Sequence, residues 1–342
     1  MKPKRWHRKS TVAVLLLGFF VLWAYWAREK DPIFQGNPLS KHLESCRVAG
    51  IHLGAEIDGI TLLKPIEPHL GNVWIDSTAR EAVLREGTNA LPMLLRMLTW
   101  GDTRGDQLLR FMVQKYGLPH WFIRTNWRAE WENQTRALAA FHTLGSTAAP
   151  AAGRIVRLLN DPETALRAIV ALTLIRPDRE DYILSLTNVA LIRKQSRTGA
   201  SPDMLLSAAV LALGSFGPKA SNAIPFLINS LSSTNDNVQA AAAVALVRVG
   251  APPEKVVPLI VKTLPKTDPT PPAGAIGMLG LGRFKETLMK IWALEQFGPK
   301  ASDALPMLSV IEKFPTVNFQ EAARNASATI KGENYIPGTR PK

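Results

Sequence analysis

The sequence predicts an all-α fold made of repeated helix pairs, preceded by one apolar N-terminal helix. A twelve-residue segment occurs twice with few changes, as Phe216–Leu227 and Phe297–Leu308. Shorter copies occur at 87–94, 145–150 and 250–258. Each copy contains signals that end one helix and begin another, and a segment repeated this often is a structural unit.

The chemistry of one copy explains why it separates two helices. An apolar run ends at Gly217, and glycine accepts the left-handed conformation that closes many helices. The proline that follows prevents the helix from continuing. Ser221 or Asn222 is expected to cap the next helix, and Pro225 falls in its first turn, where a missing N–H has no helical partner. Each unit is therefore helix A, a glycine stop, a turn and helix B.

Helix B has an apolar stripe and a polar face. Apolar residues stand one before, two after and six after the repeated proline, which places them on one side of a helix. The position two after it holds Leu94, Ala152, Leu227, Ile260 and Leu308. The position four after it holds Arg96, Arg154, Asn229 and Lys262, and then Val310. The last copy also loses the stripe at Glu312, as expected of a terminal repeat.

These units resemble HEAT repeats, the paired-helix solenoids related to armadillo repeats. The segment Leu158–Ala168, with an Asp-Pro step followed by Arg167, is similar to the turn between repeats of that family. The matching place in another copy holds Gln239, so the arginine is missing there. The resemblance covers residues 77–331 and implies a right-handed α–α superhelix, but no particular function.

The N-terminal segment predicts a membrane anchor. Residues 1–9 are basic, whereas residues 10–27 have no charged side chain and end in Trp23, Tyr25 and Trp26. This length just spans a bilayer, and aromatic side chains favour its interface. The basic flank indicates a single-pass inner or plasma membrane protein whose N-terminus is cytoplasmic and whose solenoid is exported. The alternative is secretion after cleavage of a signal peptide.

The remaining chain is expected to be organised as follows. Residues 28–75 form an irregular stalk, in which 51–53 and 60–63 are candidate short strands; the alternative is a stalk packed loosely on the first repeat. The solenoid occupies 76–331 with about six helix pairs, and 332–342 form a flexible tail. Pairs are expected at 76–87 with 89–99, 129–144 with 149–160, 162–175 with 178–193, 203–216 with 222–232, 237–249 with 253–264 and 286–297 with 303–314, then one helix at 319–331. An extra helix at 106–115 and a Trp-rich insertion at 116–131 follow the first pair.

No enzyme motif is present in the sequence. The glycine-rich segment Gly274–Gly282 lacks the Gly-Lys-Ser/Thr of a phosphate loop and follows a Pro-rich stretch. The six histidines form no metal-binding motif, and Cys46 is the single cysteine, which excludes a disulfide framework. We therefore expect no catalytic residue, no cofactor and no metal.

Two groups of residues are candidates for binding a protein partner. The first is a basic ladder on the B helices, expected to line a concave groove that fits an acidic peptide or a polyanion: Arg96, Arg154, Arg157, Lys262 and Lys313. The second is the set Trp121, Trp127 and Trp131, which could anchor a protein or stack on rings. The plain alternatives are a solvated face and a hydrophobic plug between repeats.

The predicted function is a non-enzymatic, membrane-anchored HEAT-repeat scaffold that mediates protein–protein interactions outside the cytoplasm. Two alternatives remain: a lyase-type enzyme on a HEAT-like solenoid, and a polyanion or nucleic-acid binder in the cytoplasm. The charge distribution disfavours nucleic-acid binding. The net charge is +13, and the first thirty residues contribute +6 of it (seven basic residues against Glu29). The rest of the chain therefore carries only +7, a small excess for a protein that binds phosphates.

Overall fold

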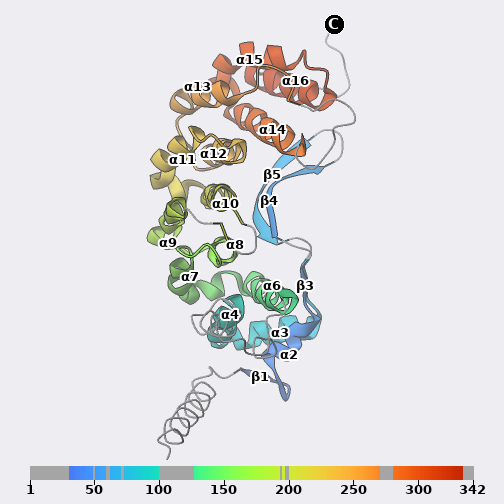
Figure 1. The fold of residues 1–342 in the computed structure, drawn as a ribbon, viewed down its shortest axis with the longest axis vertical. Coiled ribbons are helices and arrows are strands. Elements are labelled where there is room, and N and C mark those ends of the chain that lie inside the picture. Colours follow the sequence, from blue (N-terminus) through green and yellow to red (C-terminus); the bar gives the residue numbers. More distant parts are fainter. Residues whose placement is uncertain are drawn as a thin grey trace, which may run out of the picture.

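A computed structural model describes residues 31–48, 51–58, 62–70, 73–99, 127–192, 195–196, 200–269 and 280–333. Its helices stack in sequence order into one elongated column (Figure 1). The predicted helical-repeat fold is therefore confirmed. The predicted membrane helix at 10–27 and extra helix at 106–115 lie outside the described residues. Among the helices that are described, none is long and apolar enough to cross a membrane.

Six helix pairs form the column within the described ranges. The A helices are α3 (Ser77–Glu86), α6 (Trp127–Leu144), α8 (Ala165–Ile175), α10 (Pro202–Ser215), α12 (Asp236–Arg248) and α14 (Gly280–Phe297). The B helices are α4 (Leu91–Leu98), α7 (Ala152–Leu158), α9 (Glu180–Leu184), α11 (Ile224–Leu231), α13 (Pro253–Thr263) and α15 (Leu305–Ile311). A final helix, α16 (Val317–Lys331), packs on α14 and α15 and closes the far end. One boundary differs from expectation: α6 begins at Trp127, so the end of the predicted insertion is helical, since nothing in 127–131 breaks a helix.

The glycine stop between paired helices is confirmed, but the side-chain cap on helix B is wrong. Gly217 and Gly298 have φ values of 59° and 57°. A 3-10 segment then leads directly into each of the helices α4, α7, α11 and α15: η2 (Gly87–Ala90), η4 (Gly145–Ala151), η6 (Gly217–Ala223) and η7 (Gly298–Ala304). This tight turn satisfies the first N–H groups of helix B, and no side chain caps these four helices. Asn222 instead donates to the Glu180 carboxylate of the preceding repeat.

Side-chain caps are found at three A helices, α3, α10 and α12. Asp76, Ser201 and Asn235 accept hydrogen bonds from the first backbone N–H groups of α3, α10 and α12. None of these three helices continues directly from a 3-10 segment, so its first N–H groups need a side-chain acceptor.

The apolar stripe of helix B forms the core between the two layers. All five residues two positions after the repeated proline are 0% exposed: Leu94, Ala152, Leu227, Ile260 and Leu308. The A layer is held close by small side chains. A Cβ built on Gly214 of α10 would lie 2.8 Å from the Ala245 Cα of α12, so these two helix backbones nearly touch.

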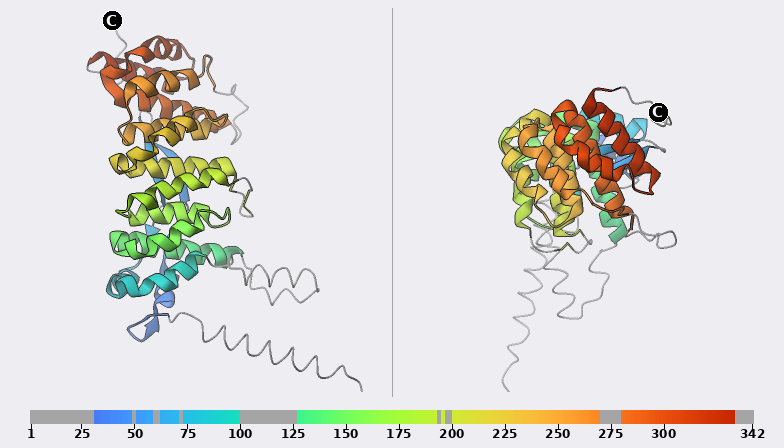
Figure 2. Two further views of the ribbon diagram at one scale, coloured as in Figure 1. Left: turned by 90° about the vertical axis from the view of Figure 1, so that its left-hand side faces the viewer. Right: turned by 90° about the horizontal axis from the view of Figure 1, so that it is seen from above.

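The N-terminal segment forms strands instead of an irregular stalk. β4 (Ile51–Asp58) and β5 (Leu62–Leu70) make an antiparallel hairpin. β5 lies against α8, α10 and α14, along the A layer (Figures 1 and 2). Loose packing on the first repeat is therefore wrong. Nine strand residues extend about 30 Å, enough to pass about three helices spaced 8–10 Å apart.

Shorter elements cover the first repeat. β1 (Ile33–Phe34) pairs with β2 (Asn37–Pro38), and β3 (Arg47–Val48) pairs with β6 (Val73–Trp74). Helix α2 (Leu39–His42) packs on α3, and Phe34, Leu39 and Leu43 are buried there. These elements give the start of the column its own hydrophobic contacts.

The hairpin leaves the B helices as the open face of the column. In the view of Figure 1 the column bows away from the hairpin, so the B helices lie on the outer side of the bow. The expectation that they line the concave face is therefore wrong. In the A layer, on the inner side of the bow, α10 and α12 approach one another closely at Gly214.

Candidate functional site

The structure brings three of the predicted basic residues together in one pocket. Arg96 of α4 and Arg154 and Arg157 of α7 line a hollow of about 320 Å³ between the first two B helices. The other lining residues are Pro92, Leu95, Thr99 and Leu158. We call this the arginine pocket.

The repeat explains why these arginines meet. Arg96 and Arg154 each stand four residues after the repeated proline, so they occupy equivalent positions on neighbouring B helices. Equivalent positions of stacked repeats lie next to one another. Arg157 follows Arg154 by about one helical turn and so lies on the same side of α7.

The arginine pocket combines positive charge with an apolar wall. Arg154 and Arg157 are exposed, Arg96 is half-buried, and Leu95 is 9% exposed. The Thr99 hydroxyl donates to the Leu95 carbonyl at 3.0 Å, so its remaining lone pairs can accept a hydrogen bond. None of the described residues that line the pocket is acidic. The pocket is therefore suited to an anionic group with an apolar neighbour.

The rest of the basic ladder does not reach the arginine pocket. Lys262 of α13 and Lys313 after α15 are exposed, but they lie toward the other end of the column (Figure 1). Between them and the pocket, the ladder position holds the neutral Asn229. The predicted continuous basic groove is therefore reduced to one pocket.

The predicted tryptophan cluster is placed only in part. Trp121 lies outside the described residues, and Trp127 begins α6, although its side chain is not among those described. Trp131 is 42% exposed on α6, an A helix, whereas the arginine pocket lies between B helices. The structure therefore does not combine Trp131 with the arginines.

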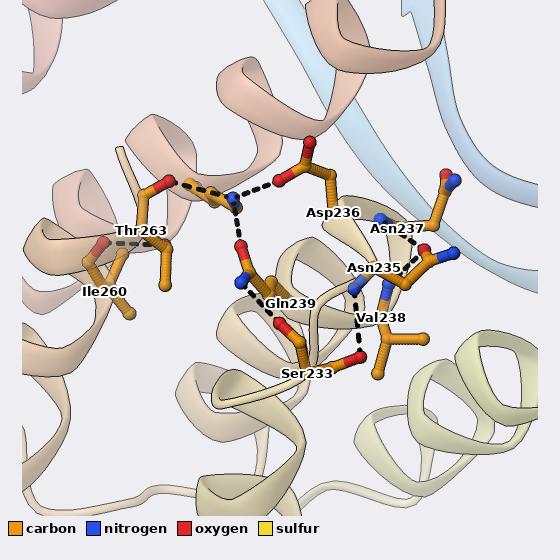
Figure 3. Close-up of polar contacts among 9 residues, drawn as sticks. Ser233, Asn235, Asp236, Asn237, Val238, Gln239, Ile260 and Thr263 are labelled. Carbon is orange, nitrogen blue, oxygen red and sulfur yellow. Dashed lines mark hydrogen bonds and ion pairs between the residues drawn. The ribbon is translucent and has the colours of Figure 1, made fainter. Parts of the chain in front are cut away.

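A buried polar joint between repeats was missed from the sequence (Figure 3). Lys290 of α14 donates through Nζ to the Gln239 amide oxygen at 2.7 Å and to the Thr263 carbonyl at 3.1 Å. Its Nζ also lies 3.5 Å from Asp236 Oδ1, and its side chain is 3% exposed. Gln239 in turn donates to the Ser233 carbonyl at 2.6 Å.

An equivalent joint links two earlier repeats. The Arg167 guanidinium donates to the Gln134 amide oxygen at 2.9 Å and to the Glu163 carbonyl at 2.6 Å. In both joints a cation on one A helix binds a glutamine on the A helix before it. Gln239 stands where the earlier repeat has Arg167, but it accepts its hydrogen bond from Lys290 of the following repeat. The two glutamine–cation pairs are 33 and 51 residues apart, so no constant spacing marks them in the sequence.

Glu286 lies one helical turn before Lys290 and is 5% exposed. The pKa of its carboxyl group is raised from 4.5 to about 7, mainly by burial. The charge of Asp236 acts in the same direction, whereas a backbone hydrogen bond and the charges of Lys290 and Lys285 act against it. The Glu286 Oε2 atom has no hydrogen-bond partner among the described residues. Within those residues no three His, Cys, Asp or Glu side chains are grouped as a metal site would require.

Comparison with known proteins identifies no family. No family model matches the chain, and no curated protein matches it. Two engineered proteins solved by the Northeast Structural Genomics Consortium are similar in structure. Target OR497 is 18% identical, with a TM-score of 0.36, 75% of this chain and 71% of that chain covered. Target OR329 is 19% identical, with a TM-score of 0.31, 71% of this chain and 96% of that chain covered. The fold assignment rests on the helix pairs themselves.

Proposed function

We propose that the protein is a non-enzymatic scaffold that binds an acidic region of a protein partner at the arginine pocket. The observation that carries the proposal is the meeting of Arg96, Arg154 and Arg157 between two successive B helices. The outward position of the B helices makes this site accessible to a folded partner. Guanidinium groups bind carboxylates through paired hydrogen bonds, which suits this recognition.

We also propose that the repeats are of the HEAT type and form a right-handed superhelix. The paired helices and the Asp-Pro turn before Arg167 support this assignment. The buried contact from Arg167 to Gln134 gives the arginine after that turn a structural reason, because it joins two repeats.

Export across a membrane is the second part of the proposal. It rests on the uncharged segment 10–27 and on the basic residues before it. A reporter enzyme fused after Lys342 is expected to be active only outside the cytoplasm, and the fusion is expected in the membrane fraction. Activity in the cytoplasm would contradict this topology and favour the polyanion-binding alternative. A soluble exported product would instead indicate signal cleavage.

Charge reversal at the pocket tests the binding proposal. The double variant Arg154→Glu with Arg157→Glu is expected to reduce partner capture by crosslinking pull-down from membranes about tenfold, because two exposed charges each contribute up to about 1 kcal/mol and reversal also adds repulsion. The matched control is Lys266→Glu with Lys300→Glu, the same change in net charge at two exposed positions away from the pocket. Equal loss in both variants, or loss in neither, would place the binding surface elsewhere.

A further inference from the structure

The first end of the column presents two large apolar side chains to solvent. β1 lies beyond α2 and α3 at this end (Figure 1). Ile33 of β1 is 69% exposed, and Leu84 of α3 is 54% exposed. Their elements touch, because the guanidinium group of Arg85, the residue after Leu84, lies over the Phe34 ring at 5.6 Å from its centroid. We call Ile33 and Leu84 the apolar end residues.

The hairpin that carries Ile33 is fixed to the column. Both residues of its two-residue turn, Gln35–Gly36, have positive φ values, of 49° and 78°. Positive φ at both positions is the geometry that closes the tightest hairpins. The backbone N–H of Ser40 in α2 donates to the Asp31 carboxylate at 3.2 Å. The chain is therefore held to α2 from Asp31 onward, and Ile33 keeps its place at the end of the column.

This end of the column is also the end nearest to the proposed membrane anchor. The uncharged segment 10–27 ends three residues before Asp31. An extended chain spans at most about 3.6 Å per residue, so Asp31 lies within about 15 Å of the end of that segment. With residues 10–27 in the bilayer, the first repeat lies at the membrane surface, whereas α15 and α16 lie at the opposite end of the column (Figure 1).

The charges around the apolar end residues balance. Together α2, the 3-10 segment Leu43–Ser45 and α3 carry three basic and three acidic residues: Lys41, Arg80 and Arg85 against Glu44, Glu81 and Glu86. Attraction of a protein to anionic lipid requires an excess of basic residues, which this end does not have. Its contact with a membrane is therefore apolar rather than electrostatic.

We infer that Ile33 and Leu84 dock on the lipid surface, so that the first repeat itself rests on the bilayer. Apolar side chains of interfacial proteins enter the boundary between head groups and acyl chains in this way. Removing each of these partly exposed side chains from water favours the docked state about tenfold. This inference rests on the proposed membrane anchor and adds the surface through which the solenoid contacts lipid.

A fluorescent label on α3 tests the inference with the full-length protein in phosphatidylcholine vesicles. An environment-sensitive nitrobenzoxadiazole label is attached at Glu81→Cys, an exposed position one helical turn before Leu84. Cys46 is buried, so the reagent labels the introduced cysteine. We expect nitroxide lipids to quench this label, and to leave the same label at Ser309→Cys, on exposed α15, unquenched.

A longer linker separates docking from tethering. About ten Gly/Ser residues are inserted between Lys30 and Asp31, which adds up to about 35 Å of reach. A column that is merely tethered then leaves the lipid surface, whereas a docked column stays. We therefore expect the label at Glu81→Cys to remain quenched after the insertion, at low and at high salt, because an apolar contact is not screened.

Two pairs of substitutions in the long-linker protein identify the residues that dock. Ile33→Ser with Leu84→Ser is expected to lower the ratio of docked to free column about a hundredfold and to abolish quenching. The matched control is Val310→Ser with Val317→Ser, which replaces two apolar side chains that are 40% and 56% exposed at the opposite end, and quenching should persist. All four side chains are exposed, so the unfolding midpoint should be unchanged in both variants.

Loss of quenching on linker insertion overturns the inference, and so does equal quenching in the two serine variants. An apolar environment of the label that nitroxide lipids do not quench, and that grows with the ratio of protein to lipid, also overturns it, because a second copy of the chain then covers this surface. The anchor is tested separately by flotation. Full-length protein that floats with the vesicles while its label is unquenched keeps the anchor and rejects docking, whereas protein that does not float rejects both.

Discussion

Leu227→Ala and Leu308→Ala are each expected to lower the free energy of unfolding by about 2–5 kcal/mol. Both side chains are 0% exposed and occupy the same position on α11 and α15, where helix B faces the core. Truncation removes apolar contacts and leaves a cavity, because the two layers of helices on either side are too closely packed to collapse fully. Urea unfolding followed by circular dichroism measures the effect.

The two leucines also differ in an informative way. Leu227 lies in the middle of the column, whereas α15 is covered by the terminal helix α16. Because each repeat contacts mainly its neighbours, the loss of Leu227 is expected to broaden the unfolding transition as well as shift it. Arg154→Ala serves as the surface control and should change stability by less than about 0.5 kcal/mol. A cost at Arg154 as large as that at Leu227 would contradict the orientation assigned to helix B.

The helix pairs could be predicted because their signals are local. The glycine stop and the stripe measured from the repeated proline depend only on nearby residues. The 3-10 turn was missed because exposed Ser221 and Asn222 resemble capping residues, while the decisive residues are small. Ala220 and Ala223 are 0% and 2% exposed, which allows the turn to press against the core and continue directly into helix B.

The hairpin along the A layer could not be placed from the sequence. Its strands pair with one another locally, but β5 lies against helices that begin at Ala165, Pro202 and Gly280. Contacts at such sequence separation leave no periodic pattern in either partner. The candidate strands at 51–53 and 60–63 identified the region, but not its length or its position on the column.

The candidate site was predicted as residues but not as a surface. Arg96 and Arg154 meet because they occupy the same position in neighbouring repeats, four residues after the repeated proline. This shared position could be recognised in the sequence. Lys262 and Lys313 follow the same rule but lie on more distant repeats, so they do not join the pocket. The side of the bow on which the B helices lie depends on the rotation between successive repeats, which the repeated positions do not reveal.

Glu286→Gln is expected to stabilise the protein at alkaline pH and to have little effect near pH 4. The pKa of the Glu286 carboxyl group is raised by burial from 4.5 to about 7 in the folded protein. A raised pKa means that the folded state holds the proton more tightly than the unfolded state. The carboxyl group is neutral in both states below pH 4.5, so no penalty arises there; stability falls as the pH rises toward 7, and the full penalty is present above it.

The expected size of this penalty is on the order of 1–3 kcal/mol, because each unit of pKa shift corresponds to about 1.4 kcal/mol. Asp236 adds to it by repulsion, whereas Lys290 and Lys285 reduce it by attraction. Glutamine keeps the shape of the side chain but cannot ionise, so the variant avoids the penalty.

Urea unfolding of the wild type and Glu286→Gln between pH 4 and 9 should show a stability difference that grows with pH and levels off above about pH 8. Glu254→Gln, at an exposed position of α13, is the control and should show no such trend. A difference between Glu286→Gln and wild type that stays constant across this range would show that the Glu286 carboxyl group has the same pKa in the folded and unfolded states, and would contradict the raised pKa.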